Sequence, residues 1–161
     1  MIVVSNSSPI TNLAAVGQLA ILHQLYETVF IPDAVYTELT TSDSAQPGGA
    51  EVQTLSWIQT KPVTDRTLVT ALQMELDPGE AAAIALAVEL KANLLLLDER
   101  RGRAVAARFG LRFVGLLGLL IEAKRTGRLA AVKPILEDLV MKAGFWVSQQ
   151  LYNRVLEAAG E

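Results

Sequence analysis

The 161-residue chain contains no cysteine and a single histidine, His23. Without cysteine there is no disulfide framework, no thiolate nucleophile and no zinc or iron–sulfur site built on cysteine ligands. One histidine excludes histidine-rich metal sites and argues against a Ser-His-Asp triad. The motifs GxGxxG, GxxxxGK[ST], GxSxG and HExxH are also missing, so the common nucleotide-binding loops, serine hydrolases and zinc peptidases are excluded as well.

Long hydrophobic runs are scarce. The apolar stretch 114–121 spans only eight residues even when its two glycines are counted, whereas a membrane-spanning helix needs about 20. The first residues, MIVVS, lack the basic start of a signal peptide. We therefore expect a cytoplasmic protein that makes no membrane contact.

Length and composition fit one folded unit. Hydrophobic residues make up 51% of the chain and charged residues 19%, far from the composition of a disordered protein. One domain typically takes about 100–200 residues. We expect a single domain over residues 1–161.

Positive charge is low overall but concentrated in one segment. The net charge of −3 argues against a general nucleic-acid binder. Residues 98–128, however, carry eight basic and three acidic side chains, which gives +5 there and −8 in the remainder. A basic segment beside acidic groups suits binding of a polyanion next to a metal site. Charge clustering alone is also explained by solvated helix faces.

Short hydrophobic runs alternate with helical patterns along the chain. The run of four leucines at 94–97 is bounded by polar residues and suits a strand buried on both faces. A polar, turn-rich stretch at 40–49 indicates a loop. The alternation predicts a parallel α/β sandwich with helices on both faces. Strands are expected at 2–5, 28–31, 57–63, 94–97 and 111–114. Two short helices separated by Gly17 are expected from Pro9, and further helices from Pro32, at 64–75, from Pro78, and at 104–109, 116–125, 129–142 and 148–159.

The strand ends indicate where a ligand would bind. In open α/β sheets, ligands bind outside the carboxyl ends of the strands. This rule singles out Asn6, after the first strand, and Asp98 with Glu99, after the 94–97 strand. Glu38 follows the second strand by about two helical turns, and Glu80 lies in the first turn of the helix before the 94–97 strand. Carboxylates and an amide at one crevice would form an all-oxygen site suited to Mg²⁺ or Mn²⁺.

Each of these residues also has a structural interpretation. The sequence DPGE at 77–80 fits a capping box, in which Glu80 stabilises a helix start. Asp98 can be the N-cap of the next helix, and Asn6 can form an Asx turn. Glu38 can be an ordinary solvated helix residue. On the residues alone, both interpretations remain open.

Five ordered sequence blocks resemble the PIN-domain family, and most closely its compact VapC-like branch of nucleic-acid-binding and toxin proteins. The resemblance extends from residue 2 to about residue 156. Any one block is weak evidence, but the five in order are specific. The blocks are VVSNSSP at 3–9, IPxxVYxE at 31–38, LDPGEAxAIALA at 76–87, LLLDERRGRxVA at 95–106 and GxLGLLxxAK at 115–124.

The resemblance implies a three-layer α/β/α fold with a parallel sheet of four or five strands, and a Mg²⁺- or Mn²⁺-dependent ribonuclease site. Its implied partners are RNA, a cognate antitoxin protein and a second copy of the chain. In this mechanism the cation lowers the pKa of a bound water, which attacks the RNA phosphodiester. The implied site comprises Glu38, Glu80 and Asp98 as catalytic residues, these three with Asn6 and Glu99 as metal ligands, and Arg100, Arg101, Arg103 and Lys124 as RNA-binding residues.

One residue departs from the family pattern, because Asn6 stands where the family has aspartate. An amide oxygen can bind a cation, but it supplies no charge and cannot act as a base. The leading hypothesis is an endoribonuclease that is the toxin of a toxin–antitoxin pair. The alternatives are a catalytically weakened module that binds RNA or protein, and a metal-dependent phosphatase or another α/β hydrolase.

The C-terminal residues also suggest a homodimer. They offer more apolar surface than a terminal helix needs to pack on one chain. The competing interpretation is that this helix only closes the core of the monomer. The residues concerned are Phe145, Trp146, Leu151, Tyr152 and Val155.

Overall fold

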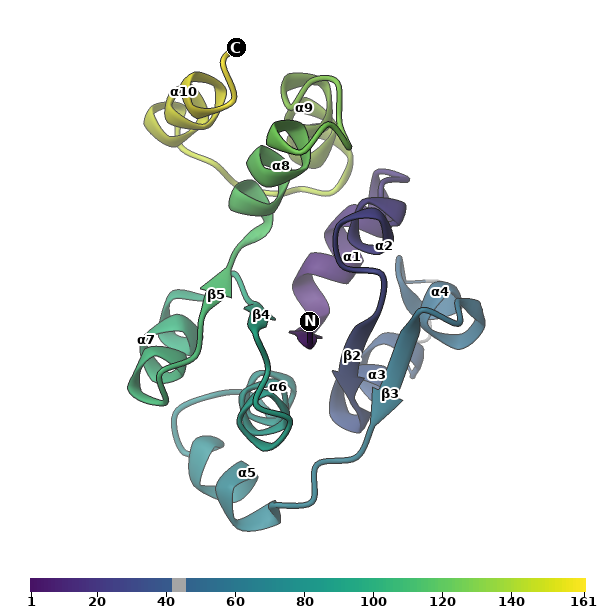
Figure 1. Cartoon of the computed structure of the whole chain (residues 1–161), viewed down its shortest axis with the longest axis vertical. Helices are drawn as coiled ribbons and strands as arrows, with labels where there is room; N and C mark the ends of the chain where they lie inside the picture. Colours follow the sequence, from purple (N-terminus) through teal and green to yellow (C-terminus); the bar gives the residue numbers. More distant parts are fainter. Residues whose placement is uncertain (42–45) are drawn as a thin grey trace.

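The computed structural model describes residues 1–41 and 46–161. It contains a five-stranded sheet in the order β3-β2-β1-β4-β5, in which every neighbouring pair of strands is parallel. The predicted parallel α/β sandwich is therefore confirmed (Figure 1). The strands are β1 (Val3–Ser5), β2 (Val29–Pro32), β3 (Ile58–Lys61), β4 (Leu94–Leu96) and β5 (Phe113–Val114).

Helices cover both faces of the sheet, and none in the described ranges is long and apolar enough to cross a membrane. In Figure 1, α8, α9 and α10 gather at one end of the molecule, and α5 lies at the opposite end. The helices are α1 (Ser7–Ala15), α2 (Ala20–Tyr26), α3 (Asp33–Thr40), α4 (Gly49–Thr54), α5 (Arg66–Leu72), α6 (Pro78–Glu89), α7 (Arg100–Arg108), α8 (Leu116–Arg125), α9 (Lys133–Lys142) and α10 (Gln149–Ala158).

Alternating residues of the central strands enter two separate cores. Val3 and Leu96 pack with α1, α2, α8 and α9, whereas Val4 and Leu95 pack with α5, α6 and α7. All four side chains are fully buried. Because successive side chains of a strand point to opposite faces, a strand covered on both faces is apolar at every position. The leucine run was correctly predicted for this reason.

Several element boundaries differ from the prediction. Helix α1 begins at Ser7 and not at Pro9, because the chain is still extended at Asn6. Pro9 then lies in the first turn of the helix, where a backbone N–H has no acceptor within the helix, so its missing N–H is tolerated. Helix α4 was not predicted, and its six residues are too few for a periodic signal. The loop expected at 40–49 is shorter at both ends, since Thr40 belongs to α3 and Gly49 to α4, and its residues 42–45 lie outside the described ranges.

The side chain of Glu161 holds the start of α9. Its carboxylate accepts hydrogen bonds from the N–H groups of Val132 (2.8 Å) and Lys133 (3.1 Å) and from the Lys124 ammonium (3.0 Å). Val132, the N-cap residue of α9, has no side chain that can do this, so Glu161 satisfies the free helix donors. These bonds, that from Val132 most of all, lower the pKa of Glu161.

We predict that Glu161→Gln lowers the free energy of unfolding by about 1 kcal/mol near neutral pH, the usual effect of weakening a helix cap. Urea unfolding followed by circular dichroism measures the change. Because folding lowers the pKa of Glu161, this stabilisation should be lost as the pH falls through the folded pKa. Glu157→Gln, on the exposed face of α10, is the control. Equal losses in the two variants would contradict the capping role.

Candidate functional site

A cavity of about 240 Å³ opens beside the carboxyl end of β1. It is bordered by the start of α1, by α3 and by the start of α6, so it lies where the strand-end rule places a ligand. Four carboxylates share it. The lining residues are Asn6, Ser7, Ser8, Thr11, Asn12, Glu38, Gln46, Asp77, Glu80 and Glu99.

Asn6 connects the sheet to the cavity. Its backbone N–H donates to the Leu96 carbonyl oxygen (3.1 Å), which extends the pairing of β1 with β4 by one residue. Asn6 is 5% exposed. Its side chain does not cap α1 and makes no hydrogen bond within the described residues, so the predicted Asx turn is not formed. The amide instead lines the cavity.

Gly79 allows three side-chain oxygens to converge on one point. A Cβ atom at position 79 would lie 2.6 Å from Oε2 of Glu38, 3.5 Å from Oδ1 of Asn6 and 3.6 Å from Oδ1 of Asp77. A hydrogen bond from the Ser7 hydroxyl (2.9 Å) holds the Glu38 oxygen in place. Residue 79 therefore has to be glycine for the Glu38 oxygen to keep its position, whereas the other two oxygens would be in ordinary contact with a Cβ atom.

Glu80 is the most buried carboxylate of the cavity, with 9% of its surface exposed. Its backbone N–H donates to Oδ1 of Asp77 (2.8 Å), which confirms Asp77 as the N-cap of α6. Burial raises the pKa of Glu80 to about 7, with further contributions from Asp77, Glu99 and Glu38. No Lys, Arg or His is among the residues that line the cavity, so its own residues do not balance the negative charge of its carboxylates.

The side chain of Asp98 lies outside this cavity. Its Oδ1 accepts the N–H of Leu116 (2.8 Å) at the start of α8, and Asp98 is not among the residues that line the cavity. The predicted role as N-cap of α7 is wrong, because Glu99 occupies that position. Burial raises the pKa of Asp98, although the Leu116 N–H and Arg103 act in the opposite direction. Its second oxygen is buried without a hydrogen-bond partner in the described residues.

The cavity thus unites Asn6, Glu38, Glu80 and Glu99 and adds Asp77, which the sequence marked only as a helix cap. The signal for Asp77 was present, because Asp77 and Glu80 lie at the same end of one helix. Within residues 1–41 and 46–161, no group of three or more acidic, histidine or cysteine side chains is arranged to hold a metal ion directly.

Most of the predicted RNA-binding cations are engaged by the protein itself. The Arg103 guanidinium donates from Nε to the Leu97 carbonyl oxygen (2.9 Å) and lies over the Phe113 ring. Arg101 donates to the Glu75 carbonyl oxygen (3.3 Å), and Lys124 pairs with Glu161. Arg100 is exposed and makes no such contact within the described part of the chain.

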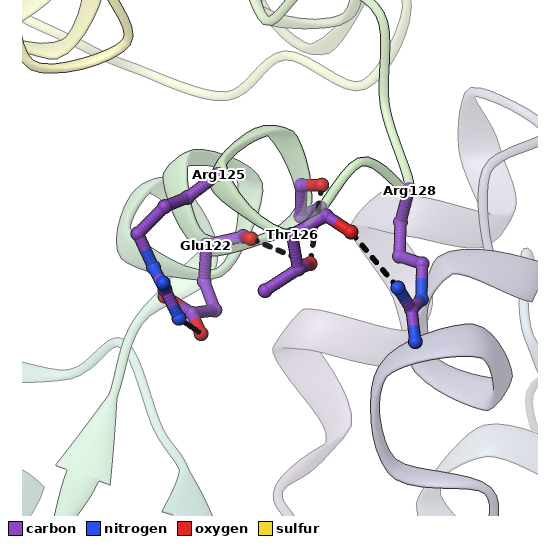
Figure 2. A network of polar contacts seen from close by, with 5 residues as sticks. Glu122, Arg125, Thr126 and Arg128 are labelled. Carbon is purple, nitrogen blue, oxygen red and sulfur yellow. Dashed lines mark hydrogen bonds and ion pairs between the residues drawn. The ribbon is translucent and has the colours of Figure 1, made fainter.

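Basic residues at the end of α8 and directly after it also make contacts within the chain (Figure 2). Arg125 folds back on Glu122 with two hydrogen bonds, which lowers the pKa of Glu122. Arg128 donates to the carbonyl oxygens of Thr126 (2.8 Å) and Gln24 (3.3 Å). These contacts favour the structural interpretation of the basic segment over a continuous polyanion-binding face.

A family model described as a PIN domain matches residues 2–161. No curated protein matches the sequence.

We predict that the metal-free protein loses stability as the pH rises. The pKa of Glu80 is raised from its ordinary value of 4.5 to about 7 by folding. The folded state therefore binds more protons than the unfolded state between these values, and the free energy of unfolding falls as the pH rises across this window.

Urea unfolding in EDTA at about pH 5 and about pH 8 tests this, with Glu80→Gln as the informative variant. Glutamine mimics the protonated acid, so the variant should match the parent at the lower pH and exceed its stability at the higher pH. Glu157→Gln is again the control. A parent and a Glu80→Gln variant with the same pH dependence would contradict the raised pKa.

Proposed function

Because this chain belongs to the PIN-domain family, we propose that it is a Mg²⁺- or Mn²⁺-dependent endoribonuclease that acts at the cavity beside β1. The observation that carries the proposal is the grouping of four carboxylates and a buried amide in about 240 Å³. Without a metal, neighbouring carboxylates repel one another, and this repulsion is unfavourable for the folded state. A bound cation would offset it. We further propose that residues 1–161 form a single domain of this type.

The donor set fits a hard divalent cation. Every candidate ligand offers oxygen, and the oxygens of Glu38 and Asn6 lie beside the space that glycine leaves at position 79, next to an oxygen of Asp77. Mg²⁺ usually keeps several waters and takes one or two carboxylates directly, so a cavity without a tight three-carboxylate group still suits it. We propose Asn6, Glu38, Glu80 and Glu99 as the ligands that face the cavity. Asp98, at the end of β4, is a fifth proposed ligand, and it would have to exchange its hydrogen bond with the Leu116 N–H for the cation.

In this proposal each residue has a role that follows from its environment. A divalent cation would supply Lewis acidity and lower the pKa of water at the site. Glu38, oriented by Ser7, presents a charged oxygen to the cavity. Glu80, with a pKa of about 7, can hold or release a proton near neutral pH. Asp98 positions the start of α8 against β4 through the Leu116 N–H.

RNA is the proposed substrate. Arg100, which lies directly after Glu99 and makes no internal contact in the described residues, is the cation best placed to meet the RNA backbone. Arg101, Arg103 and Lys124 would have to exchange their present partners to do so. The similarity of five sequence blocks to VapC-like proteins supports a cytoplasmic toxin with an antitoxin partner.

Asn6 supports a second candidate function. With an amide in place of the family's aspartate, the cavity has one charged ligand fewer, and its cation affinity should be reduced. A module that binds RNA or protein without turnover is therefore the alternative to the ribonuclease.

We also propose that the chain forms a homodimer through an α9–α10 surface made by Val140, Met141, Trp146 and Leu151. Met141 and Trp146 are 83% and 81% exposed, beside a groove of about 260 Å³. Other residues of the predicted dimer surface serve the core, because Val155 is buried and Phe145 packs against the core. The exposed remainder is an unusual cluster of large apolar side chains for a monomer.

We predict that the protein cleaves single-stranded RNA in Mn²⁺ and not in EDTA. Glu38→Gln and Glu80→Gln should each reduce the rate about a hundredfold or more, as expected for groups that act on the reacting atoms. Gel analysis of a labelled RNA measures cleavage, and circular dichroism confirms that the variants fold. Glu157→Gln, far from the cavity in sequence and structure, should cleave like the parent.

The outcomes separate the candidate functions. RNA binding without cleavage in either cation would favour the binding module. Hydrolysis of p-nitrophenyl phosphate without RNA cleavage would favour a phosphatase. Equal rates for the parent and Glu80→Gln would remove this cavity as the site.

We predict a mass by light scattering of twice 17.4 kDa at micromolar concentration. Trp146→Ala should shift the mass toward that of one chain, because it removes the largest apolar side chain of the α9–α10 surface. Phe109→Ala, on α7's exposed end, is a matched control for loss of an exposed aromatic ring. A parent protein of 17.4 kDa would contradict the dimer.

A further inference from the structure

Arg103 holds the short connection between β4 and α7 at two points. Its side-chain Nε donates to the Leu97 carbonyl oxygen (2.9 Å), and its backbone N–H donates to the Glu99 carbonyl oxygen (2.9 Å). Leu97 and Glu99 directly precede and follow Asp98 in the chain. Arg103 therefore binds the backbone on each side of Asp98.

The guanidinium of Arg103 lies in a closely fitted space. Its Cζ is 5.6 Å from the centroid of the Phe113 ring, over the face of that ring. A Cβ atom at position 115 would overlap Nη2 of Arg103 and would lie 2.7 Å from Oδ1 of Asp98. Glycine at position 115 thus lets a guanidinium and a carboxylate lie together at the start of α8.

Leu97, whose carbonyl group Arg103 holds, is itself fixed on two sides. Its side chain is fully buried, and its N–H donates to the Val114 carbonyl oxygen (3.0 Å). A Cβ atom at position 102 would lie only 3.1 and 3.3 Å from its two methyl carbons, so Gly102 allows α7 to approach it closely. Through Arg103, the exposed residue Glu99 is therefore attached to a tightly packed part of the sheet.

These contacts use properties of arginine that lysine lacks. A guanidinium is planar, donates several N–H bonds in fixed directions and stacks on aromatic rings, whereas an ammonium group is a compact point charge. A phosphate of RNA, in contrast, binds either cation. The environment of Arg103 is therefore specific for arginine in a way that a surface contact with RNA would not require.

We propose that Arg103 is a positioning residue of the acidic cavity, which holds the connection after β4 so that Glu99 faces the cavity and the Asp98 carboxylate stays at the start of α8. This inference rests on the proposed function, because it assigns a role in that same site. In this role Arg103 does not contact RNA, unlike the role that the resemblance implies. Loss of its contacts should slow RNA cleavage without weakening RNA binding, because small displacements of reacting groups reduce rates strongly.

Steady-state cleavage of a labelled single-stranded RNA in Mn²⁺ tests the proposal with Arg103→Lys, which keeps the charge. We expect kcat to fall about tenfold or more and KM to stay within about twofold of the parent value. Arg108→Lys is the matched control, because Arg108 lies on the same helix and pairs with Glu75 at the surface (3.0 Å). It should behave like the parent. An Arg103→Lys variant with the parent's kcat, whether or not its KM rises, would overturn the proposal.

Hydrogen exchange of the metal-free full chain gives a readout that does not depend on activity. The Leu116 N–H donates to Asp98 (2.8 Å) and should be protected in the parent. In Arg103→Lys its exchange rate, relative to the amides of β2, should rise about tenfold. The comparison with β2 removes any change in global stability. An unchanged ratio would overturn the proposal.

Gly115→Ala is a second variant that keeps Arg103 and fills part of the space of its guanidinium. It should lower kcat in the same way as Arg103→Lys, with KM little changed. If circular dichroism shows that Arg103→Lys does not fold, Gly115→Ala decides the question, and a parent-like kcat in this variant would then overturn the proposal.

The outcomes separate this inference from the proposed function. A parent that does not cleave RNA, with faster relative exchange of the Leu116 N–H in Arg103→Lys, would refute the ribonuclease and leave the positioning role standing. RNA cleavage by the parent, with unchanged kcat and exchange in Arg103→Lys, would refute the positioning role alone.

Discussion

Repulsion among carboxylates is the constraint under which the rest of the cavity is built. Glu38, Asp77, Glu80 and Glu99 reach one small space from separate parts of the chain. Local interactions offset part of this repulsion, since Asp77 accepts the Glu80 N–H at the start of α6, where the helix dipole favours negative charge. Burial first, and then the neighbouring carboxylates, raise the pKa of Glu80. Glu80 bears most of this constraint, because it is buried and rigidly placed at the start of α6, whereas Glu38, Asp77 and Glu99 are exposed.

Helix α6 supplies that rigidity. Every residue from Gly79 to Ala87 is buried, and the helix packs against β1, β2 and β4. Alanine predominates in this stretch, so the helix backbone lies close to the sheet with little side-chain freedom to lose. A start of α6 fixed in this way cannot move outward to relieve the charge at Glu80. Apolar packing along the same helix thus stabilises the fold against the unfavourable burial of the Glu80 carboxylate.

The sequence predicted the fold where one physical signal was dominant and failed where two competed. The leucines of β4 suit a strand buried on both faces, and four of the residues that the sequence placed at the proposed crevice, Asn6, Glu38, Glu80 and Glu99, line one cavity. The strand-end rule fixes the end of the sheet but not the direction of each side chain. Asp98 follows β4 as expected, yet the free N–H of Leu116 draws its carboxylate to α8. That contact joins positions 18 residues apart and has no local sequence signal.

The capping of α9 by Glu161 has a consequence for the order in which the chain folds during synthesis. All five strands are complete by Val114. The acceptor for the Lys133 N–H is Glu161, which lies 28 residues after Lys133. The sheet and its first helices can therefore pack while the start of α9 still lacks its cap. On a ribosome, α9 gains that cap only after residue 161 has emerged. The start of α9, which carries part of the exposed α9–α10 surface, is thus capped by a residue that is made after every residue that lines the acidic cavity.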